Sequence, residues 1–349
     1  MKKIIHQLIS ILFLLATEMN GSTTVIPVLS ASPESGFQVG VVAAKYYRTE
    51  GSTPNSRPSG ISPMFTYSTK GQVYAGLNWE RYWAEEKHYF KQELEYADTP
   101  RNFYGTGNFT SLFNEESISS RYALFKFQYL YRFKHHLRLG TKFDFKKETV
   151  TKIESGGQFE SNNYLGSSPY QVFGMGPIIN IDSRDHILKP IKGINHTYSL
   201  LFYDTQFSDF QFTNLTIDLR QYIPISKNKT IALNGLSTTM GGSVPVQHLA
   251  QLGGSKVVRG TYEGRYRDLN LMAFQAEYRH YQAFKKMGYV LFLGVGSVYS
   301  DFGHLDVNDF RIMPGFGLRF PIANEGAHLR FDFGFSEKTN FYVSYAEAW

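Results

Sequence analysis

Apolar and polar side chains alternate along runs of about 10 to 15 residues, and this pattern constrains the fold more than any other feature. In residues 121–133 the phase that begins at Ala123 is apolar or aromatic throughout, whereas the other carries Lys126, Gln128 and Arg132. Residues 137–146 repeat the pattern. Because successive side chains of a strand point to opposite faces, these runs are predicted to be β-strands.

The alternation alone fits a water-soluble β-sandwich or a membrane barrel, since both bury one face of each strand. Two further observations favour the barrel. The runs are longer than typical soluble strands and match the roughly 9–11 residues that a tilted strand needs to cross a bilayer. Aromatic residues make up 16% of the chain, and many stand at the ends of runs, as in the aromatic girdles of barrels. We therefore predict an all-β, antiparallel transmembrane barrel.

Sixteen strands are predicted, and an even number places both termini on the periplasmic side. Their expected ranges are 24–31, 36–48, 60–69, 72–84, 88–98, 118–133, 136–151, 171–184, 194–206, 210–224, 229–242, 268–284, 287–300, 310–321, 327–336 and 339–349. The long connections then lie outside and the short ones in the periplasm. Two periplasmic connections, 49–59 and 185–193, are longer than this asymmetry predicts.

Residues 1–22 are predicted to be a cleaved signal peptide, which leaves 23–349 as the barrel. Lys2 and Lys3 precede a short apolar run, 8–16, that cannot cross a bilayer as a helix. A buried N-terminal helix is the alternative, but no other helix is predicted for it to pack against. Export implies the outer membrane of a Gram-negative bacterium, with outer-membrane lipids around the barrel.

Composition excludes several classes of function. The chain has no cysteine, so disulfide frameworks and thiolate metal sites are excluded. The net charge of +6 comes from scattered basic residues, which does not indicate a nucleic-acid partner. No GxSxG element is present, and the adjacent His135 and His136 fall in or beside a predicted periplasmic turn. We expect no catalytic activity, no metal and no cofactor.

Between the eleventh and twelfth predicted strands, a long outer connection carries an arginine among glycines, in the stretch LGGSKVVRGTYEGRYRD of residues 252–268. Other unusual segments follow one another along the chain. They are PESG at 33–36, FYGTGN at 103–108, DSRD at 182–185 with Pro190 and Gly193 after it, and EYR at 277–279. In this order they resemble the bacterial surface antigen superfamily, the sixteen-stranded barrels of the BamA and TamA type. The resemblance implies that the sixth outer loop folds back into the lumen.

The resemblance also implies a glutamate in the lumen that meets the loop arginine. The apolar phase of the twelfth strand contains Met272 and Phe274, so Glu277 is expected to face the lumen. A guanidinium inside a barrel must be paired or hydrated, and we predict an Arg259–Glu277 ion pair. We call Val258, Arg259, Gly260 and Glu277 the loop lock. The alternative is a solvated outer loop whose arginine has no partner.

The chain departs from the family on the thirteenth strand. Where the family has a second acid in a DxG element, this sequence has Gly294, followed by Val295 and Gly296. Arg259 is therefore expected to be held less firmly, or to use another acid such as Asp182 or Asp332. Asp182, Arg184 and Asp185 are otherwise expected only as part of the family's DSRD segment.

The resemblance predicts a working site at the seam, by which we mean the junction of the first and last strands. The residues expected there are Pro27, Val28, Val343, Tyr345 and Trp349. Pro27 lacks a backbone donor, which would weaken the pairing of the first strand. The family's periplasmic POTRA domains are expected to be missing, because few residues separate the predicted cleavage site from the first strand.

The function implied by the resemblance is insertion or translocation of proteins at the outer membrane, or lipid handling. Clients would be unfolded outer-membrane or exported proteins, and a periplasmic partner or a partner barrel would deliver them. The alternative is a passive pore or a structural barrel, because the predicted lumen is lined by charged residues such as Lys126, Lys142 and Arg220.

Overall fold

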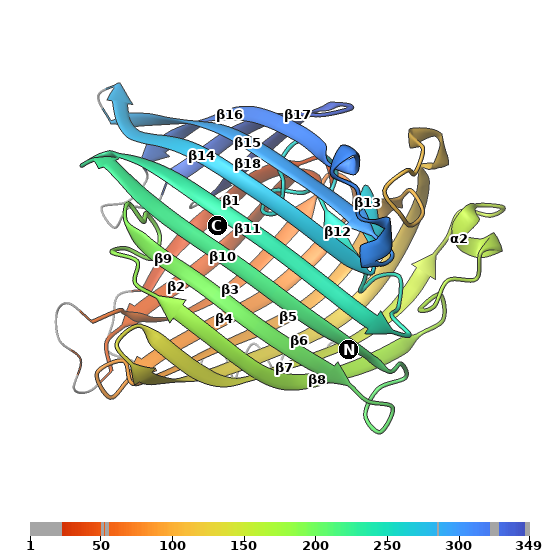
Figure 1. Cartoon of the computed structure of the whole chain (residues 1–349), viewed down its shortest axis with the longest axis horizontal. Helices are drawn as coiled ribbons and strands as arrows, with labels where there is room; N and C mark the ends of the chain where they lie inside the picture. The colour runs from red at the N-terminus through yellow and green to blue at the C-terminus, as the bar shows by residue number, and fades with distance from the viewer. Residues whose placement is uncertain (1–22, 50–51, 53–55, 285, 322–327, 346–349) are drawn as a thin grey trace.

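The computed structural model describes residues 23–49, 52, 56–284, 286–321 and 328–345. Sixteen antiparallel strands close into a barrel, in which the last strand pairs with the first (Figure 1). The barrel strands are β1 (Thr23–Ser32), β2 (Gly36–Tyr47), β3 (Ser59–Ser68), β4 (Val73–Trp83), β5 (His88–Phe103), β6 (Glu116–Lys134), β7 (Leu137–Lys152), β8 (Tyr170–Asp182), β9 (Gly193–Tyr203), β10 (Phe212–Ser226), β11 (Lys229–Gly242), β14 (Asn270–Phe284), β15 (Met287–Tyr299), β16 (Arg311–Pro321), β17 (His328–Phe335) and β18 (Thr339–Tyr345). The predicted fold class and strand number are confirmed.

The remaining elements lie in the outer connections. Two short strands, β12 (Ala250–Leu252) and β13 (Tyr266–Asp268), pair with each other within the connection between β11 and β14. Short helices are η1 (Leu112–Asn114), α2 (Gln158–Ser161), η2 (Phe302–His304) and η3 (Val307–Asp309). Within the described ranges, no helix has both the length and the apolar character that crossing a bilayer requires.

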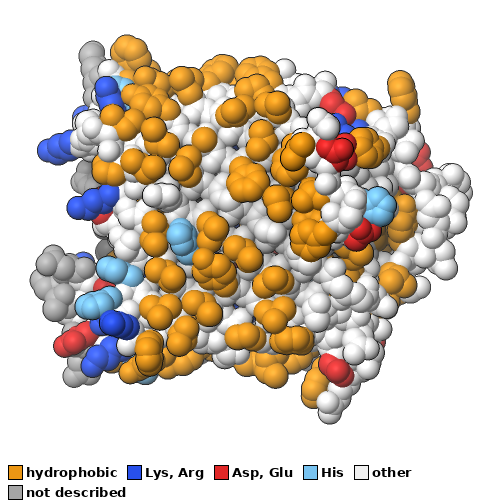
Figure 2. Space-filling model, viewed as in Figure 1, with side chains coloured by type: hydrophobic (Ala, Val, Ile, Leu, Met, Phe, Trp, Pro, Cys, Tyr) orange, Lys and Arg blue, Asp and Glu red, His pale blue; other side chains and the backbone are white. Residues whose placement is uncertain are grey.

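The strands are apolar outside and polar inside, the reverse of a soluble protein. Figure 2 shows hydrophobic side chains spread over the outer surface of the strands. In β14, the side chain of Phe274 is 49% exposed, whereas Gln275, Glu277 and Arg279 are buried. The predicted phase of this strand is therefore correct. Such an exterior is favourable in lipid, because exposing this much apolar surface to water would be costly.

The two ends of the barrel differ in their connections and their charge. The longest connections, with α2 and the β12–β13 pair, lie at the right of Figure 1, and most connections at the left are shorter. Lys and Arg side chains gather at the left end in Figure 2, while acidic side chains gather at the right. We assign the end with the longest connections to the outside and the other end to the periplasm. The predicted signal peptide and Trp349 lie outside the described residues.

The strand boundaries differ from prediction most clearly in β5. The predicted run ended at residue 98, but β5 continues to Phe103 and pairs with β6 as far as Glu116. The added residues, TPRNF, are mostly polar. Ladder hydrogen bonds require no apolar phase once a strand leaves the membrane, so alternation could not predict this extension.

Candidate functional site

The connection between β11 and β14 folds into the barrel. Val258 and Leu252 are fully buried, and they pack with Tyr266, Val298 and Met313 in one hydrophobic cluster. Val298 and Met313 belong to strands β15 and β16, so this part of the loop lies against the inner wall. The predicted course of the sixth outer loop is therefore present, and the alternative of a solvated loop is wrong.

Arg259 is held by two acids from different strands. Its guanidinium forms an ion pair with Glu277 of β14, as predicted, and its Nη1 donates to Asp332 of β17 at 2.7 Å. The guanidinium also lies 3.9 Å from the ring centroid of Phe292 on β15. All three charged side chains are completely buried. Because each acid lies on a separate strand, the arginine ties the loop to a wide section of the wall.

Further arginines surround the two acids. Arg279 contacts Glu277 at 2.6 Å, while Arg319 and Arg330 contact Asp332 at 2.6 and 3.3 Å. Buried charges are tolerated only where they are paired and hydrogen-bonded, and removing one partner of such a pair is costly. Sequence analysis named Asp332 only as an alternative partner and did not predict this shared cluster.

Asp182, the other alternative partner, is not near Arg259. It pairs with Arg57 and Arg184 at the periplasmic end of the barrel, at 2.7 and 3.0 Å. The expectation that it holds the loop arginine is therefore wrong. Asp182 is the last residue of β8 and Asp332 lies in the middle of β17, so barrel geometry rather than charge selects between them.

The two glycines of β15 explain the missing acid. A Cβ atom at Gly294 would lie 2.4 Å from Cγ1 of Val258, and one at Gly296 would lie 2.6 Å from Cδ1 of Leu252. Both side chains of the loop thus occupy the space above these glycines. Here the strand supplies room for the loop instead of charge, and Asp332 supplies the second acid.

The loop continues along the strands beside the seam. Backbone N–H of Gly260 donates to Tyr342 Oη at 3.2 Å, and this hydroxyl donates to the carbonyl of Thr261 at 3.0 Å. Asn340 and Ser336 donate to the carbonyl of Gly260, the latter at 2.7 Å. Gly260 needs its φ of +131°, and a Cβ at Gly334 would lie 2.6 Å from its Cα. The loop is therefore fixed to β18 and to the β17–β18 turn.

On the other side of the seam, the loop reaches the turn between β1 and β2. Backbone N–H of Glu263 donates to Glu34 Oε1 at 2.6 Å. Glu34 belongs to the PESG segment that sequence analysis noted. Segment 260–263 thus contacts β18 on one side of the seam and the β1–β2 turn on the other, and we call it the seam strap.

The FYGTGN segment after β5 also contacts the loop. Gly107 N–H donates to the carbonyl of Arg267 at 2.7 Å, and the guanidinium of Arg267 lies 5.0 Å from the ring of Phe103. Tyr262 Oη accepts from backbone N–H of Asn102 at 2.9 Å. The loop therefore crosses the outer half of the lumen, from β14 and β17 to β5.

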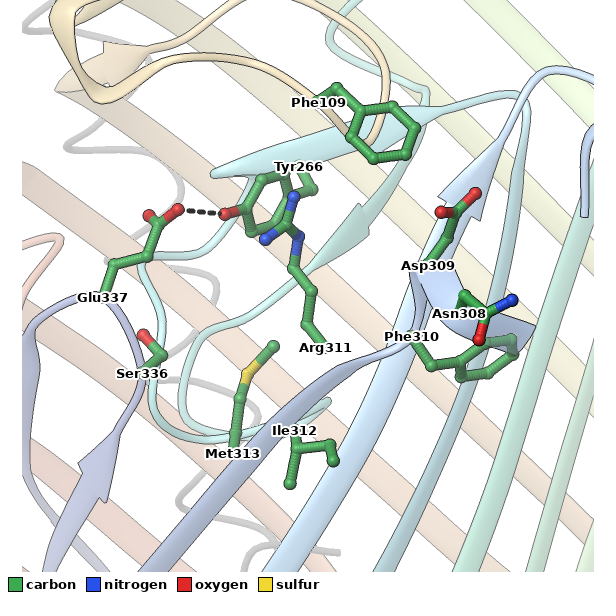
Figure 3. Close-up of a pocket in the computed structure, with 10 residues that line it drawn as sticks. All are labelled: Phe109, Tyr266, Asn308, Asp309, Phe310, Arg311, Ile312, Met313, Ser336 and Glu337. Atoms are coloured by element: carbon green, nitrogen blue, oxygen red, sulfur yellow. Dashed lines mark hydrogen bonds between the residues drawn. The ribbon is translucent and has the colours of Figure 1, made fainter. Parts of the chain in front are cut away.

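A pocket of about 280 Å³ opens at the outer end, beside the β17–β18 turn (Figure 3). The guanidinium of Arg311 lies 3.9 Å from the ring centroid of Tyr266, and Tyr266 Oη donates to Glu337 at 2.7 Å. In Figure 3, Phe109 lies on the side of Tyr266 opposite Glu337. The pocket borders the loop, and its contacts tie β13 to β16 and to the β17–β18 turn.

The seam joins β1 and β18 in antiparallel register, with Ala31 opposite Val343. Val28 is 6% exposed and its neighbour Leu29 58%, so Val28 faces the lumen. Val343 faces lipid, because the adjacent Tyr342 contacts the loop inside. Val28 and Val343, both predicted at the seam, therefore lie on opposite faces of the wall. Pro27 is in β1 as predicted, and Tyr345 ends β18 opposite Leu329 of β17.

Some charged residues of the site were not found from sequence. Arg57, Glu86 and Arg138 join Asp182 at the periplasmic end, where Arg138 Nη2 lies 3.6 Å from Glu86 Oε2. Each comes from a different connection or strand, so no local motif links them. The one available signal was the unusual length of connections 49–59 and 185–193. Across the described residues, no group of three acidic or histidine side chains could hold a metal ion.

These features define a class: a closed, sixteen-stranded membrane barrel with a sixth outer loop pinned in its lumen by a buried arginine. A family model for the Omp85 superfamily domain matches residues 55–345. The chain belongs to the Omp85 superfamily, whose barrels lie in the bacterial outer membrane.

Solved structures show the same fold at low identity. BamA from Haemophilus ducreyi lacking POTRA domains 1–3 has a TM-score of 0.63 at 11% identity, over 94% of this chain and 70% of that one. CdiB from Acinetobacter baumannii has a TM-score of 0.60 at 9% identity, over 93% and 59%. CdiB from Escherichia coli has a TM-score of 0.54 at 11% identity, over 91% and 62%. No curated protein sequence matches this chain.

Proposed function

We propose that this barrel assists the insertion or translocation of proteins at the outer membrane by opening at its seam. Unfolded outer-membrane or exported proteins would be its clients, delivered by a periplasmic partner or a partner barrel, with lipid handling as a related role. An exposed strand edge can pair with an incoming strand, which gives the seam a physical means of accepting a client. We propose no catalytic role and no cofactor.

The seam strap is the observation that carries this proposal. Segment 260–263 binds β18 through Tyr342 and the β1–β2 turn through Glu34. These contacts are all near the outer end, so the loop can hold the two strands together there while the rest of the seam depends on strand pairing. The seam is therefore held by a loop as well as by strand pairing, and release of the loop would leave strand pairing alone to hold it.

A passive pore is the alternative function, and the polar lumen favours it. The loop lock argues against it, because the loop crosses the lumen and is fixed by completely buried ion pairs. Any aqueous path must pass around this loop. A wide path along the axis would require the lock to open, at the cost of uncovering buried charges.

Photo-crosslinking in native outer membranes tests the proposal. Photoreactive residues would replace Leu29 on β1 and Val343 on β18, both on the lipid face, and Leu215 on β10 as a matched position far from the seam. We expect outer-membrane proteins, identified by mass spectrometry, to be captured at the two seam positions and not at Leu215. Equal capture at all three positions, or crosslinks only between β1 and β18, would contradict it.

A further inference from the structure

The connection between β8 and β9, residues 183–192, turns inward across the periplasmic mouth. The carbonyl of Ile191 accepts from Oγ1 of Thr230 on β11 at 2.8 Å. Nζ of Lys189 lies 4.5 Å from the ring centroid of Tyr281 on β14. In the barrel order, β9, β10 and β11 separate β8 from β14. The segment therefore reaches well beyond its neighbouring strands.

Both contacts are made inside the barrel. Thr230 and Tyr281 are 0% and 1% exposed, and they share the phase of lumen-facing Ala232 and Arg279. Tyr281 stacks on His328 of β17 with ring centroids 5.3 Å apart. The segment and these side chains together cover the β9 to β17 side of the mouth.

On the opposite side, Asp182 holds the segment to the other long periplasmic connection. Asp182 Oδ2 accepts from Arg57 at 2.7 Å, and its Oδ1 accepts from backbone N–H and Nε of Arg184 at 3.1 and 3.0 Å. Backbone N–H of Arg57 donates to Glu86 at 2.8 Å. Arg57 precedes β3, which is separated from β8 by four strands. We call Arg57, Asp182 and Arg184 the periplasmic clasp.

The segment is also ordered by its own contacts. Asp185 Oδ1 accepts from backbone N–H of Ile191 and Lys192, at 3.0 and 3.2 Å. Gly193 has a φ of +104°, and a Cβ there would lie 2.3 Å from the carbonyl oxygen of Ser183. Only glycine fits this close approach without strain. The acids and the glycine of the DSRD…P..G pattern thus shape an inward turn, whereas a solvated loop would need none of these contacts.

We propose that segment 183–192 is a periplasmic gate, held shut by the clasp and separate from the loop lock in the outer half of the lumen. The lumen then has two barriers in series, one near each mouth. A client or partner arriving from the periplasm meets the gate first, and it must displace Asp182 from Arg57 to pass. This inference rests on the barrel and its contacts, and it stands whether the barrel inserts proteins or conducts solutes.

Conductance in planar lipid bilayers tests the gate. Because barriers in series mask each other, the key comparison is made in an Arg259→Ala background, in which the loop lock is weakened. Asp182→Asn removes the charge that holds Arg57 and Arg184 while keeping the shape of the side chain. We expect the Arg259→Ala/Asp182→Asn barrel to conduct several-fold more than Arg259→Ala alone.

Asp218→Asn is the matched control. Like Asp182, Asp218 pairs with the arginine two residues after it, Arg220, but it makes none of the contacts described for the gate. In the same background it is expected to leave conductance unchanged. If Asp182→Asn raises conductance no more than Asp218→Asn does, in barrels that fold as shown by heat-dependent gel migration, the gate proposal is wrong.

A disulfide lock provides a second test, because it holds the segment by a covalent bond that does not depend on the clasp. The chain has no cysteine, so Thr230→Cys with Ile191→Cys introduces the only thiols. With Arg259→Ala and Asp182→Asn also present, oxidation is expected to lower conductance to that of Arg259→Ala alone, and reduction to restore it. Conductance that stays high after the disulfide has formed would show that the segment does not close the mouth.

Discussion

At the residue scale, the loop arginine illustrates what local sequence can and cannot predict. The family resemblance implied a glutamate partner in the lumen, and strand phase, which acts over a few residues, agreed by placing Glu277 there. The second acid required the register of strands β14 to β17, which sets which lumen side chains meet. Asp182 and Asp332 were equal candidates from sequence, and only the closed barrel distinguishes them.

Replacing Arg259 with alanine is expected to lower the free energy of unfolding by about 3–5 kcal/mol, because it removes one partner from a buried charge cluster. Arg259→Lys should recover only part of this loss, since an ammonium cannot bridge Glu277 and Asp332 as a planar guanidinium does. Urea unfolding of barrels folded in liposomes measures both variants. Equal stability of wild type and Arg259→Ala would show that the pair does not hold the loop.

Gly294 and Val258 are expected to be coupled. Gly294→Ala places a methyl group 2.4 Å from Cγ1 of Val258, and overpacking of this kind costs about 1–3 kcal/mol. In a Val258→Ala background the same change should cost clearly less. A double-mutant cycle of unfolding free energies measures the coupling, and additive effects would contradict the packing explanation.

At the scale of the elements, alternation located all sixteen strands within a few residues, because each crosses lipid with one apolar face. It did not predict the polar end of β5 or the β12–β13 pair, where strands leave the membrane and no apolar phase is required. The two periplasmic connections that were too long for simple turns are the two that meet through Arg57 and Asp182. Their length was visible in the sequence, but their contact was not.

The Glu34 end of the seam strap is expected to depend on pH. Burial, together with the nearby charge of Glu263, raises the pKa of Glu34 above its ordinary value. The stabilising contribution of the protonated form is present below the unfolded pKa and is lost as pH rises through the folded pKa. Glu34→Gln keeps the acceptor for Glu263 N–H without the charge, so this variant should be more stable than wild type at neutral pH.

The advantage of Glu34→Gln should disappear as pH falls below the ordinary pKa of a glutamate, because wild type then carries a neutral side chain as well. Urea unfolding at neutral and mildly acidic pH measures both differences. A variant that is less stable than wild type at neutral pH would mean that the ionised carboxylate strengthens the strap.

At the scale of the whole molecule, one loop crosses the outer half of the lumen and also braces the seam. The Arg259 cluster holds the loop to β14 and β17. The seam strap binds the same loop to β18 and to the β1–β2 turn. Because this loop obstructs the axis, its position supports the proposal that the barrel works by lateral opening at the seam. The family model and the closed sixteen-stranded wall establish the fold in which this proposal is framed.

The central claim is that the seam must open for the protein to work, and a reversible seam lock tests it most directly. Ala31 and Val343 are directly opposed across the seam, so cysteines at these positions in the cysteine-free chain can form a disulfide between β1 and β18. The measurement is the rate at which a urea-denatured outer-membrane protein inserts into liposomes that contain the barrel. We predict that the oxidised barrel gives no acceleration and that reduction restores it, whereas equal acceleration in both states would contradict the claim.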